Sequence, residues 1–136
     1  MIFIDDAHRD FYESEMTALK DDCHHRALVY TIGICSDTRR NFSAMYDKKE
    51  RAIISDSIYA AWQTGSSTKL TRLAFNLFTD RVPTALAYDD TGRTVTEDFN
   101  ECQRYSVSDI FCCSYATYFF EAIRIRYPEY FKTPAW

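Results

Sequence analysis

Glycine and proline are scarce in this chain, with three residues of each among 136. All-β sandwiches and barrels use many such residues in their turns, so this scarcity argues against those folds. No apolar run approaches the roughly 20 residues that a membrane-spanning helix needs. Only four residues precede the first two aspartates, which predicts no signal peptide. Together these absences predict a soluble, cytoplasmic protein that has no membrane partner.

Paired cysteine motifs are missing too. The chain has five cysteines but no Cys-x-x-Cys spacing, which argues against a zinc ribbon and against a thioredoxin-type site. An odd number of cysteines without disulfide-like spacing is typical of a reducing compartment. We therefore expect five free thiols, at Cys23, Cys35, Cys102, Cys112 and Cys113.

The chain also lacks a basic excess. Its 16 Lys and Arg residues are interspersed with 20 Asp and Glu residues, and the net charge is −4. A general nucleic-acid binder carries a clustered basic surface. The charge pattern therefore predicts no direct, general binding of nucleic acid.

Aromatic residues, in contrast, are abundant at 16% of the chain, and many of them lie in residues 106–131. That segment is apolar nearly all round, which predicts a helix over residues 107–127, either straight or kinked near Ser114, that is surrounded by the rest of the protein. The length is typical of one domain. We predict an all-α or nearly all-α fold: a single domain, residues 1–136, in which a compact helical bundle surrounds the buried C-terminal helix. The residues expected to be buried there are Phe111, Tyr115, Tyr118, Phe119, Ala122 and Ile123.

The remaining elements follow from periodicity and from cap residues. Residues 28–34 form a β-rich run, but their apolar spacing also fits a helix, which we favour over a strand. Residues 53–62 are read as a short helix or an extended segment, and residues 84–100 as a long loop with a turn at 89–92. After the stop at Pro128, three aromatic residues are expected to fold back on the domain. The expected helices cover residues 5–22, 24–34, 36–46, 66–80 and 107–127, and the three aromatic residues are Tyr130, Phe131 and Trp136.

The strongest local signal for a ligand is a Gly-Ser-Ser-Thr-Lys stretch at a helix start. Free N–H groups there, together with hydroxyl and cationic side chains, would suit a phosphate-like anion. The spacing is not that of a Walker A motif, and simple capping by Ser66 or Ser67 is the alternative explanation. The candidate anion-binding residues are Gly65, Ser66, Ser67, Lys69 and Arg72.

Catalytic and metal-binding sets are not recognisable. Cys23, His24 and His25 are consecutive, so they cannot all point inward from one helix face to share a zinc ion. No histidine follows residue 25, and nothing in the sequence pairs a histidine with a cysteine as base and nucleophile. We predict no enzyme activity, no metal site and no cofactor.

Two basic residues, Arg39 and Arg40, are expected in the first turn of a helix, where the helix dipole disfavours cations. Their charge is therefore expected to meet an acid, either within the fold or on a partner. With Trp62 they are the candidate partner-binding residues, because Arg and Trp are enriched at interface hot spots.

Five short motifs, in a fixed order, carry a resemblance that spans nearly the whole chain. They are His25-Arg26-Ala27-Leu28; Asp37-Thr38-Arg39-Arg40-Asn41; Trp62-Gln63-Thr64 followed by Ala74-Phe75-Asn76-Leu77; Glu101-Cys102-Gln103-Arg104-Tyr105; and Arg126-Tyr127-Pro128-Glu129-Tyr130. The sequence resembles a family of small uncharacterised bacterial proteins that are often carried on phages and other mobile elements. This resemblance implies a genomic setting, but no activity and no site residues.

Two functions from different classes are compatible with these observations. The first is an interaction protein that inhibits a host defence protein, as small proteins of mobile elements without enzyme motifs often do. The second is a protein that binds or sequesters a phosphorylated molecule at residues 66–69. An enclosed pocket at that helix start would favour the second function, and a flat aromatic surface would favour the first. The sequence leaves the oligomeric state open.

Overall fold

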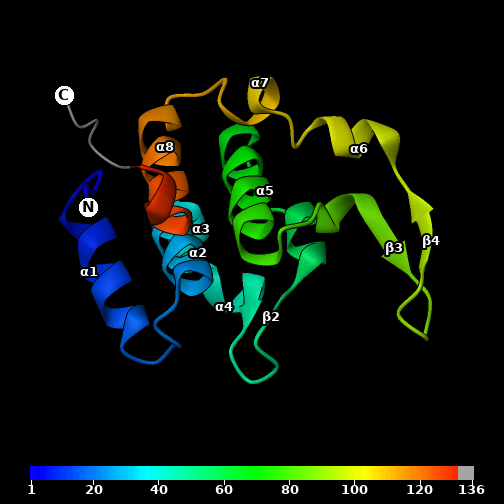
Figure 1. Cartoon of the computed structure of the whole chain (residues 1–136), viewed down its shortest axis with the longest axis horizontal. Coiled ribbons are helices and arrows are strands. Elements are labelled where there is room, and N and C mark those ends of the chain that lie inside the picture. Colours follow the sequence, from blue (N-terminus) through cyan, green and yellow to red (C-terminus); the bar gives the residue numbers. More distant parts are fainter. Residues whose placement is uncertain (132–136) are drawn as a thin grey trace.

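The computed structural model describes residues 1–131, without the side chains of residues 94–96. Helices dominate it, as predicted, and the few strands form two separate hairpins (Figure 1). The helices are α1 (Asp6–Met16), α2 (Cys23–Gly33), α3 (Ser36–Arg40), α4 (Phe42–Met45), α5 (Gly65–Thr79), α6 (Phe99–Gln103), α7 (Val107–Ile110) and α8 (Ala116–Arg126), with 3-10 turns η1 (Ser55–Tyr59), η2 (Pro83–Ala85) and η3 (Pro128–Tyr130). The strands are β1 (Tyr46–Asp47), β2 (Ala52–Ile53), β3 (Leu86–Tyr88) and β4 (Thr94–Glu97).

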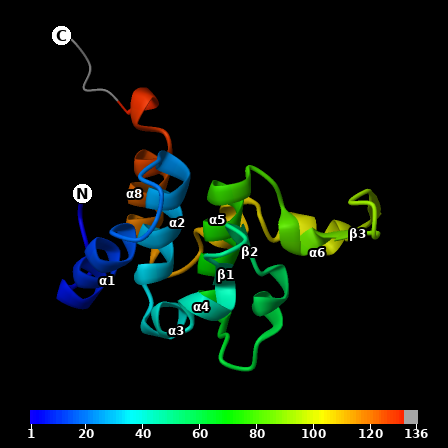
Figure 2. The same cartoon turned by 90° about the horizontal axis from the view of Figure 1, so that it is seen from below.

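Helix α2 is the buried centre of the fold. It packs against α1, α5 and α8, and in Figures 1 and 2 it lies among these three helices. Asp22 caps its first turn by accepting a hydrogen bond from the His25 N–H at 2.8 Å. The hydroxyl of Thr31 donates to the Ala27 carbonyl at 2.6 Å, so this buried polar group is satisfied within the helix. The prediction of a helix here is confirmed, and the strand alternative is wrong. Packing of α1, α5 and α8 around this β-rich run outweighs its preference for a strand.

The C-terminal segment departs from the prediction. Instead of one helix over residues 107–127 there are two, α7 and α8, and the break between them at residues 111–115 contains Ser114, the position considered for a kink. Phe119 is fully buried, but its neighbour Phe120 is 60% exposed, so α8 covers the core from one side and is not surrounded. Of the six residues expected to be buried, Phe119 and Ala122 are; partly buried are Phe111, Tyr115, Tyr118 and Ile123. Of the three aromatic residues expected to fold back, Tyr130 and Phe131 are 78% and 43% exposed, so that expectation is wrong for them, and Trp136 lies outside the described residues.

Helix α5 is the second central element, and its position is as predicted. Its cap differs: Thr64 accepts from the Ser67 N–H at 3.1 Å, and the Ser67 hydroxyl accepts from the Thr64 N–H at 2.7 Å. This reciprocal pair is a capping box, which places Ser67 inside the first turn and not at the cap. At the other end Asp80 closes the helix in the left-handed conformation, with φ of 58°.

Elsewhere, tertiary packing shortens the expected elements. Helix α1 ends at Met16 and not at residue 22, and the helix expected over residues 36–46 is broken at Asn41 into α3 and α4. Residues 84–100, expected to be a loop, contain η2 and the β3–β4 hairpin, whose turn at residues 89–92 is where it was predicted. In Figure 2 this hairpin extends away from the helical body. None of the helices within residues 1–131 has the length and apolar character to cross a membrane.

Candidate functional site

The residues predicted to bind an anion are partly used by the fold itself. Ser67 is fully buried, and its hydroxyl also donates to the Gln63 side chain at 2.5 Å. Ser66 is partly exposed but does not line the hollow at this helix end. That hollow, of about 370 Å³, is lined by Gly65, Lys69 and Arg72 among others. Three of the five predicted residues therefore meet, whereas the two serines do not join them.

Both cations of that set have partners within the protein. The Lys69 ammonium group donates to the backbone carbonyl of Asp109 and lies 3.5 Å from its carboxylate. Arg72 forms a two-pronged pair with Glu101, at 2.7 Å from Nε to Oε1 and 3.2 Å from Nη2 to Oε2. Arg104 brings a third cation to the same hollow. Two of the three positive charges are thus balanced by carboxylates at this surface.

The predicted partner-binding residues are also engaged within the fold. Arg39 and Arg40 lie in the last turn of α3, where cations are favoured, so the expectation of a first-turn position is wrong. Arg39 donates to the Gly33 carbonyl at 2.7 Å, and Arg40 pairs with Asp37. Trp62 is partly buried against the core beside α2. All three residues therefore have contacts within the fold, and both arginines are hydrogen-bonded to oxygen atoms of the same chain.

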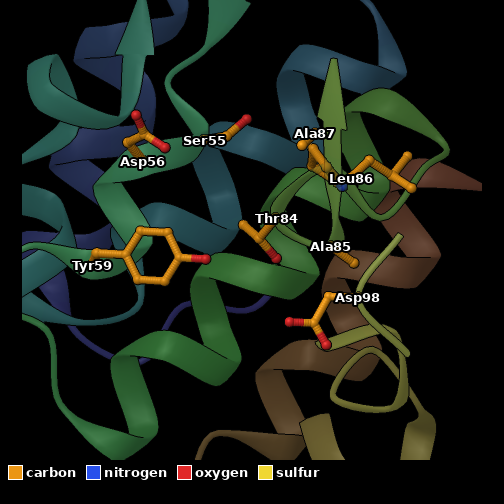
Figure 3. A pocket seen from close by; sticks show the side chains of 9 residues that line it. Ser55, Asp56, Tyr59, Thr84, Ala85, Leu86, Ala87 and Asp98 are labelled. Atoms are coloured by element: carbon orange, nitrogen blue, oxygen red, sulfur yellow. The ribbon is translucent and has the colours of Figure 1, made fainter. Parts of the chain in front are cut away.

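A different hollow, of about 270 Å³, lies between η1, η2 and the start of β3. Its wall carries the carboxylates of Asp56 and Asp98 and the ring of Tyr59, which is 73% exposed. In Figure 3 the Tyr59 hydroxyl and the Asp98 carboxylate point toward one another from opposite sides of the hollow. None of the residues that line it is Lys, Arg, His or Cys. We call this feature the acidic hollow.

Local structure explains how these side chains are held. Asp56 lies in the first turn of η1 and Tyr59 three residues later, so both project from the same short turn. Asp98 caps α6, where one carboxylate oxygen accepts from the Glu101 N–H at 3.0 Å. The second oxygen makes no hydrogen bond to the residues whose side chains the structure describes (1–93 and 97–131), which leaves it for a ligand. Both carboxylates therefore keep accepting capacity at the surface.

The base of the acidic hollow is fixed by a buried network. Thr84 lines the hollow, and its hydroxyl donates to Glu101 at 2.8 Å while also contacting the Tyr105 hydroxyl. Burial raises the pKa of Tyr105, so its hydroxyl stays protonated. Glu101 is in turn held by Arg72. Thr84 and the start of α6, which carries Asp98, are therefore held by a network that joins α5, α6 and η2.

The chemistry of the acidic hollow is that of a cation-binding site. Carboxylates attract a guanidinium or an ammonium group, and the face of a tyrosine ring adds a cation–π interaction. Its lining offers no Cys, and no His or Lys that would activate the hydroxyls of Ser55 and Thr84, so this arrangement favours binding over covalent chemistry. Within residues 1–131, no group of three His, Cys, Asp or Glu side chains is arranged to hold a metal ion.

Sequence reasoning missed the acidic hollow because its residues come from three stretches, 55–59, 83–87 and 98, that are separate in the sequence. The interpretation of residues 84–100 as a loop hid the Asp98 cap, although Asp-x-x-Glu before residue 102 is itself a helix-start signal. The i,i+3 spacing of Asp56 and Tyr59 was visible but not informative without the partner segment.

Comparison with protein families identifies the family to which the chain belongs. The model of a family of unknown function (DUF6075) matches residues 1–136, so the chain belongs to that family. Comparison with curated proteins and with solved structures gave no match.

Proposed function

We propose that this protein is a non-enzymatic binding protein that inhibits a bacterial defence component by binding a basic patch on the surface of that component. One observation carries the proposal: the acidic hollow combines two carboxylates with a largely exposed tyrosine and has no cation of its own. The negative charge of the acidic hollow is therefore available to pair with a positive group of another molecule.

A lysine or arginine side chain of a partner fits the acidic hollow chemically. A guanidinium group would pair with Asp56 or Asp98 and lie against the ring of Tyr59. The network beneath Thr84 also holds the start of α6, where Asp98 is the cap, which lowers the entropic cost of binding on that side of the hollow. The net charge of −4 adds a long-range attraction to a basic surface and accelerates encounter at low salt.

The class of partner follows from the same electrostatics and from the resemblance to proteins of mobile elements. Defence nucleases hold nucleic acid in basic channels, because phosphate neutralisation supplies most of that affinity. An acidic, compact protein is suited to occupy or cover such a channel. The proposed partner is therefore a host defence protein, and the interaction needs neither a metal nor a cofactor.

The alternative, capture of a phosphorylated molecule at Gly65–Lys69, has weaker support. Lys69 and Arg72 already face Asp109 and Glu101, which offsets the charge that would attract a phosphate. A thermal-shift experiment with inorganic phosphate separates the two functions. A rise in melting temperature that disappears in Lys69→Ala would favour the alternative.

The proposal is tested by removing the negative charge of the acidic hollow. In the double variant Asp56→Asn/Asp98→Asn the shape stays similar, because asparagine is also a good helix cap. The matched control is Glu13→Gln/Glu50→Gln, which removes the same charge from exposed positions outside the hollow. We expect the hollow variant to lose the partner in pull-downs from a bacterial host, and the control variant to retain it.

The functional readout is immunity. Cells that express the protein are challenged with phage or plasmid across a panel of defence systems. The wild type and the control variant should lower the immunity conferred by one system, and the hollow variant should not. Unchanged immunity across the whole panel would contradict the proposed function, and equal inhibition by both variants would show that the acidic hollow does not carry it.

A further inference from the structure

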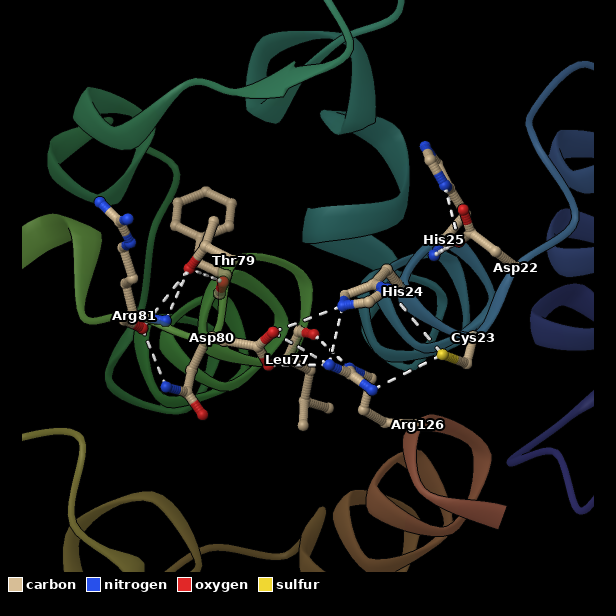
Figure 4. Close-up of polar contacts among 11 residues, drawn as sticks. Asp22, Cys23, His24, His25, Leu77, Thr79, Asp80, Arg81 and Arg126 are labelled. Carbon is tan, nitrogen blue, oxygen red and sulfur yellow. Dashed lines mark hydrogen bonds and ion pairs between the residues drawn. The ribbon is translucent and has the colours of Figure 1, made fainter. Parts of the chain in front are cut away.

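Outside the acidic hollow, one polar cluster joins three helices whose residues are far apart in sequence. Cys23 and His24 begin α2, Asp80 ends α5 and Arg126 ends α8. Figure 4 shows their side chains converging at one point beside the α2 N-terminus. The cluster is not needed by the proposed function, and it contains the one cysteine that is hydrogen-bonded to both a histidine and an arginine within residues 1–131.

Arg126 is the hub of this cluster. Its side chain is only 10% exposed, and its Nε donates to the Leu77 carbonyl at 2.9 Å. Nη2 donates to both oxygens of Asp80, at 2.8 and 3.0 Å. Nη1 donates to the sulfur of Cys23 at 3.5 Å. The guanidinium group is therefore fixed in position, and one of its N–H groups is directed at a thiol.

The contact between Arg126 and His24 determines where the imidazole proton lies. Nη2 of Arg126 and Nε2 of His24 are 2.7 Å apart. A guanidinium group can only donate, so Nε2 is the acceptor in this contact, which is shorter than the 3.4 Å between Nε2 and Oδ2 of Asp80. We therefore assign the ring proton to Nδ1. That Nδ1 is 3.8 Å from the sulfur of Cys23. The ring therefore directs a second donor at the same sulfur.

The sulfur of Cys23 thus has a donor environment. It faces Nη1–H of Arg126 and Nδ1–H of His24, and it lies in the first turn of the eleven-residue helix α2, whose positive end favours negative charge. Neighbouring positive charge, hydrogen-bond donors and a helix N-terminus are the features that stabilise a thiolate and make a cysteine reactive. Cys23 is also partly exposed, and 39% of the His24 side chain is accessible, so a small molecule can reach the site.

The other cysteines lack this environment. Cys35 is buried in the core. Cys102 lies 3.5 Å from a carboxylate oxygen of Glu97, and partial burial together with that carboxylate raises the pKa of its thiol. Cys112 is the most exposed of the five, but no described residue donates a hydrogen bond to its sulfur. The chain therefore contains its own reference thiols.

We propose that Cys23 is a reversible thiol-modification site that reacts with small disulfides. The thiolate sulfur attacks one sulfur of the disulfide, so a new S–S bond forms as the old one breaks. The departing half leaves as a thiolate and takes a proton from water. Cys23 is oxidised to a mixed disulfide while the released thiol is reduced, and excess free thiol reverses the exchange.

Modification at this point would also act on the fold. A mixed disulfide is a poorer hydrogen-bond acceptor than the free sulfur, so Nη1 of Arg126 would lose its partner at the junction of α2, α5 and α8. The attached group would also need space between His24 and Arg126. We therefore expect the modified protein to melt at a lower temperature than the free thiol form, and excess dithiothreitol to restore the original value.

The test uses the full chain and the disulfide 5,5′-dithiobis(2-nitrobenzoate) at less than one equivalent near neutral pH. Modified peptides are quantified by mass spectrometry over time. Cys23 should react about tenfold faster than Cys112, or more, and Cys102 should be slower than both. Access alone predicts the opposite order for the first two, because Cys112 is the more exposed. A Cys23 rate equal to or below that of Cys112 would overturn the proposal.

Two variants test the cause of the reactivity. Arg126→Lys keeps the positive charge but cannot reach Cys23, Asp80 and Leu77 together, and His24→Ala removes the second donor from a partly exposed position. Each should lower the Cys23 rate toward the Cys112 rate while the Cys112 rate stays constant. Modification of the buried Cys35 would reveal that the Arg126 variant has unfolded. In that case the Cys23 rate in His24→Ala alone tests the role of the cluster. An unchanged Cys23 rate in folded His24→Ala would overturn the role of the cluster.

Discussion

Arg72 and Glu101 form a buried, two-pronged ion pair that connects α5 with α6. The distances are 2.7 Å between Nε and Oε1 and 3.2 Å between Nη2 and Oε2, and the two side chains are 8% and 12% exposed. Glu101 also accepts the hydroxyl of Thr84, which lines the acidic hollow. One pair of charges, 29 positions apart, thus organises the support beneath the candidate binding site.

Breaking this pair should be costly. In Arg72→Ala the carboxylate of Glu101 stays buried without its main partner, and we expect the free energy of unfolding to fall by about 3–5 kcal/mol. The matched control is Arg104→Ala, because Arg104 lies 3.8 Å from the same carboxylate but is 57% exposed. That change should cost about 0–1 kcal/mol. Urea unfolding of both variants measures the difference, and equal losses would contradict the assignment of Arg72 as the structural partner.

Adjacent phenylalanines of α8 should differ sharply in their contribution to stability. Phe119 is fully buried, and its replacement by alanine should cost about 3–5 kcal/mol. Phe120 is 60% exposed and has a ring contact with Phe111 at 4.9 Å, so Phe120→Ala should cost about 1 kcal/mol. Chemical denaturation of the two single variants tests this. Similar costs would indicate that α8 is surrounded on both sides, as the sequence had suggested.

Gly33 should not tolerate a side chain. A Cβ at this position would lie 2.7 Å from Cδ2 of His8 and 2.8 Å from Cδ1 of Phe11, because α1 crosses α2 closely there. We expect Gly33→Ala to lower the free energy of unfolding by about 1–3 kcal/mol through overpacking. Gly65→Ala is the control, since nothing lies within 4 Å of a Cβ built at that position. It should leave stability unchanged or raise it by up to about 1 kcal/mol.

The stability of the fold should decrease at mildly acidic pH because of His8. The ring is fully buried; Nδ1 accepts from the Ile4 N–H at 3.2 Å, and Nε2 donates to the Tyr30 carbonyl at 2.7 Å. Loss of hydration on burial lowers the pKa of His8 below its ordinary value of 6.5, although the Tyr30 carbonyl and Asp5 oppose this shift and Arg39 adds to it. The unfolded chain therefore binds a proton at a pH at which the folded ring stays neutral.

The sign of the effect follows from this difference in proton binding. The contribution of His8 is present above pH 6.5 and is lost as the pH falls from 6.5 toward the lowered pKa of the folded state. Urea unfolding from about pH 7.5 down to about pH 5.5 should show the loss, and His8→Gln should flatten the curve over that range. Parallel curves for the wild type and His8→Gln would contradict a neutral buried His8, because His24 and His25 remain in both proteins.

Local chemistry alone was enough to predict several elements. The helices around residues 24–34 and 66–80 follow from apolar spacing, although the cap of the second is Thr64 and not Ser66 or Ser67. The scarcity of glycine and proline correctly indicated a mostly helical class. These features depend on interactions between residues close in sequence, so they can be predicted from the sequence alone.

Tertiary structure decided which helix is central and which charges remain available. The aromatic C-terminal segment and the α2 segment are both apolar enough to be buried, and only long-range packing selects α2 and interrupts the other at residues 111–115. Arg72 and Lys69 looked like ligand-binding cations because Glu101 and Asp109 are 29 and 40 positions away. His24 and Arg126 meet across 102 positions, and Asp56 and Asp98 share a hollow only after η1 and α6 are placed. Periodicity and capping act over a few residues, so they carry no information about such pairings.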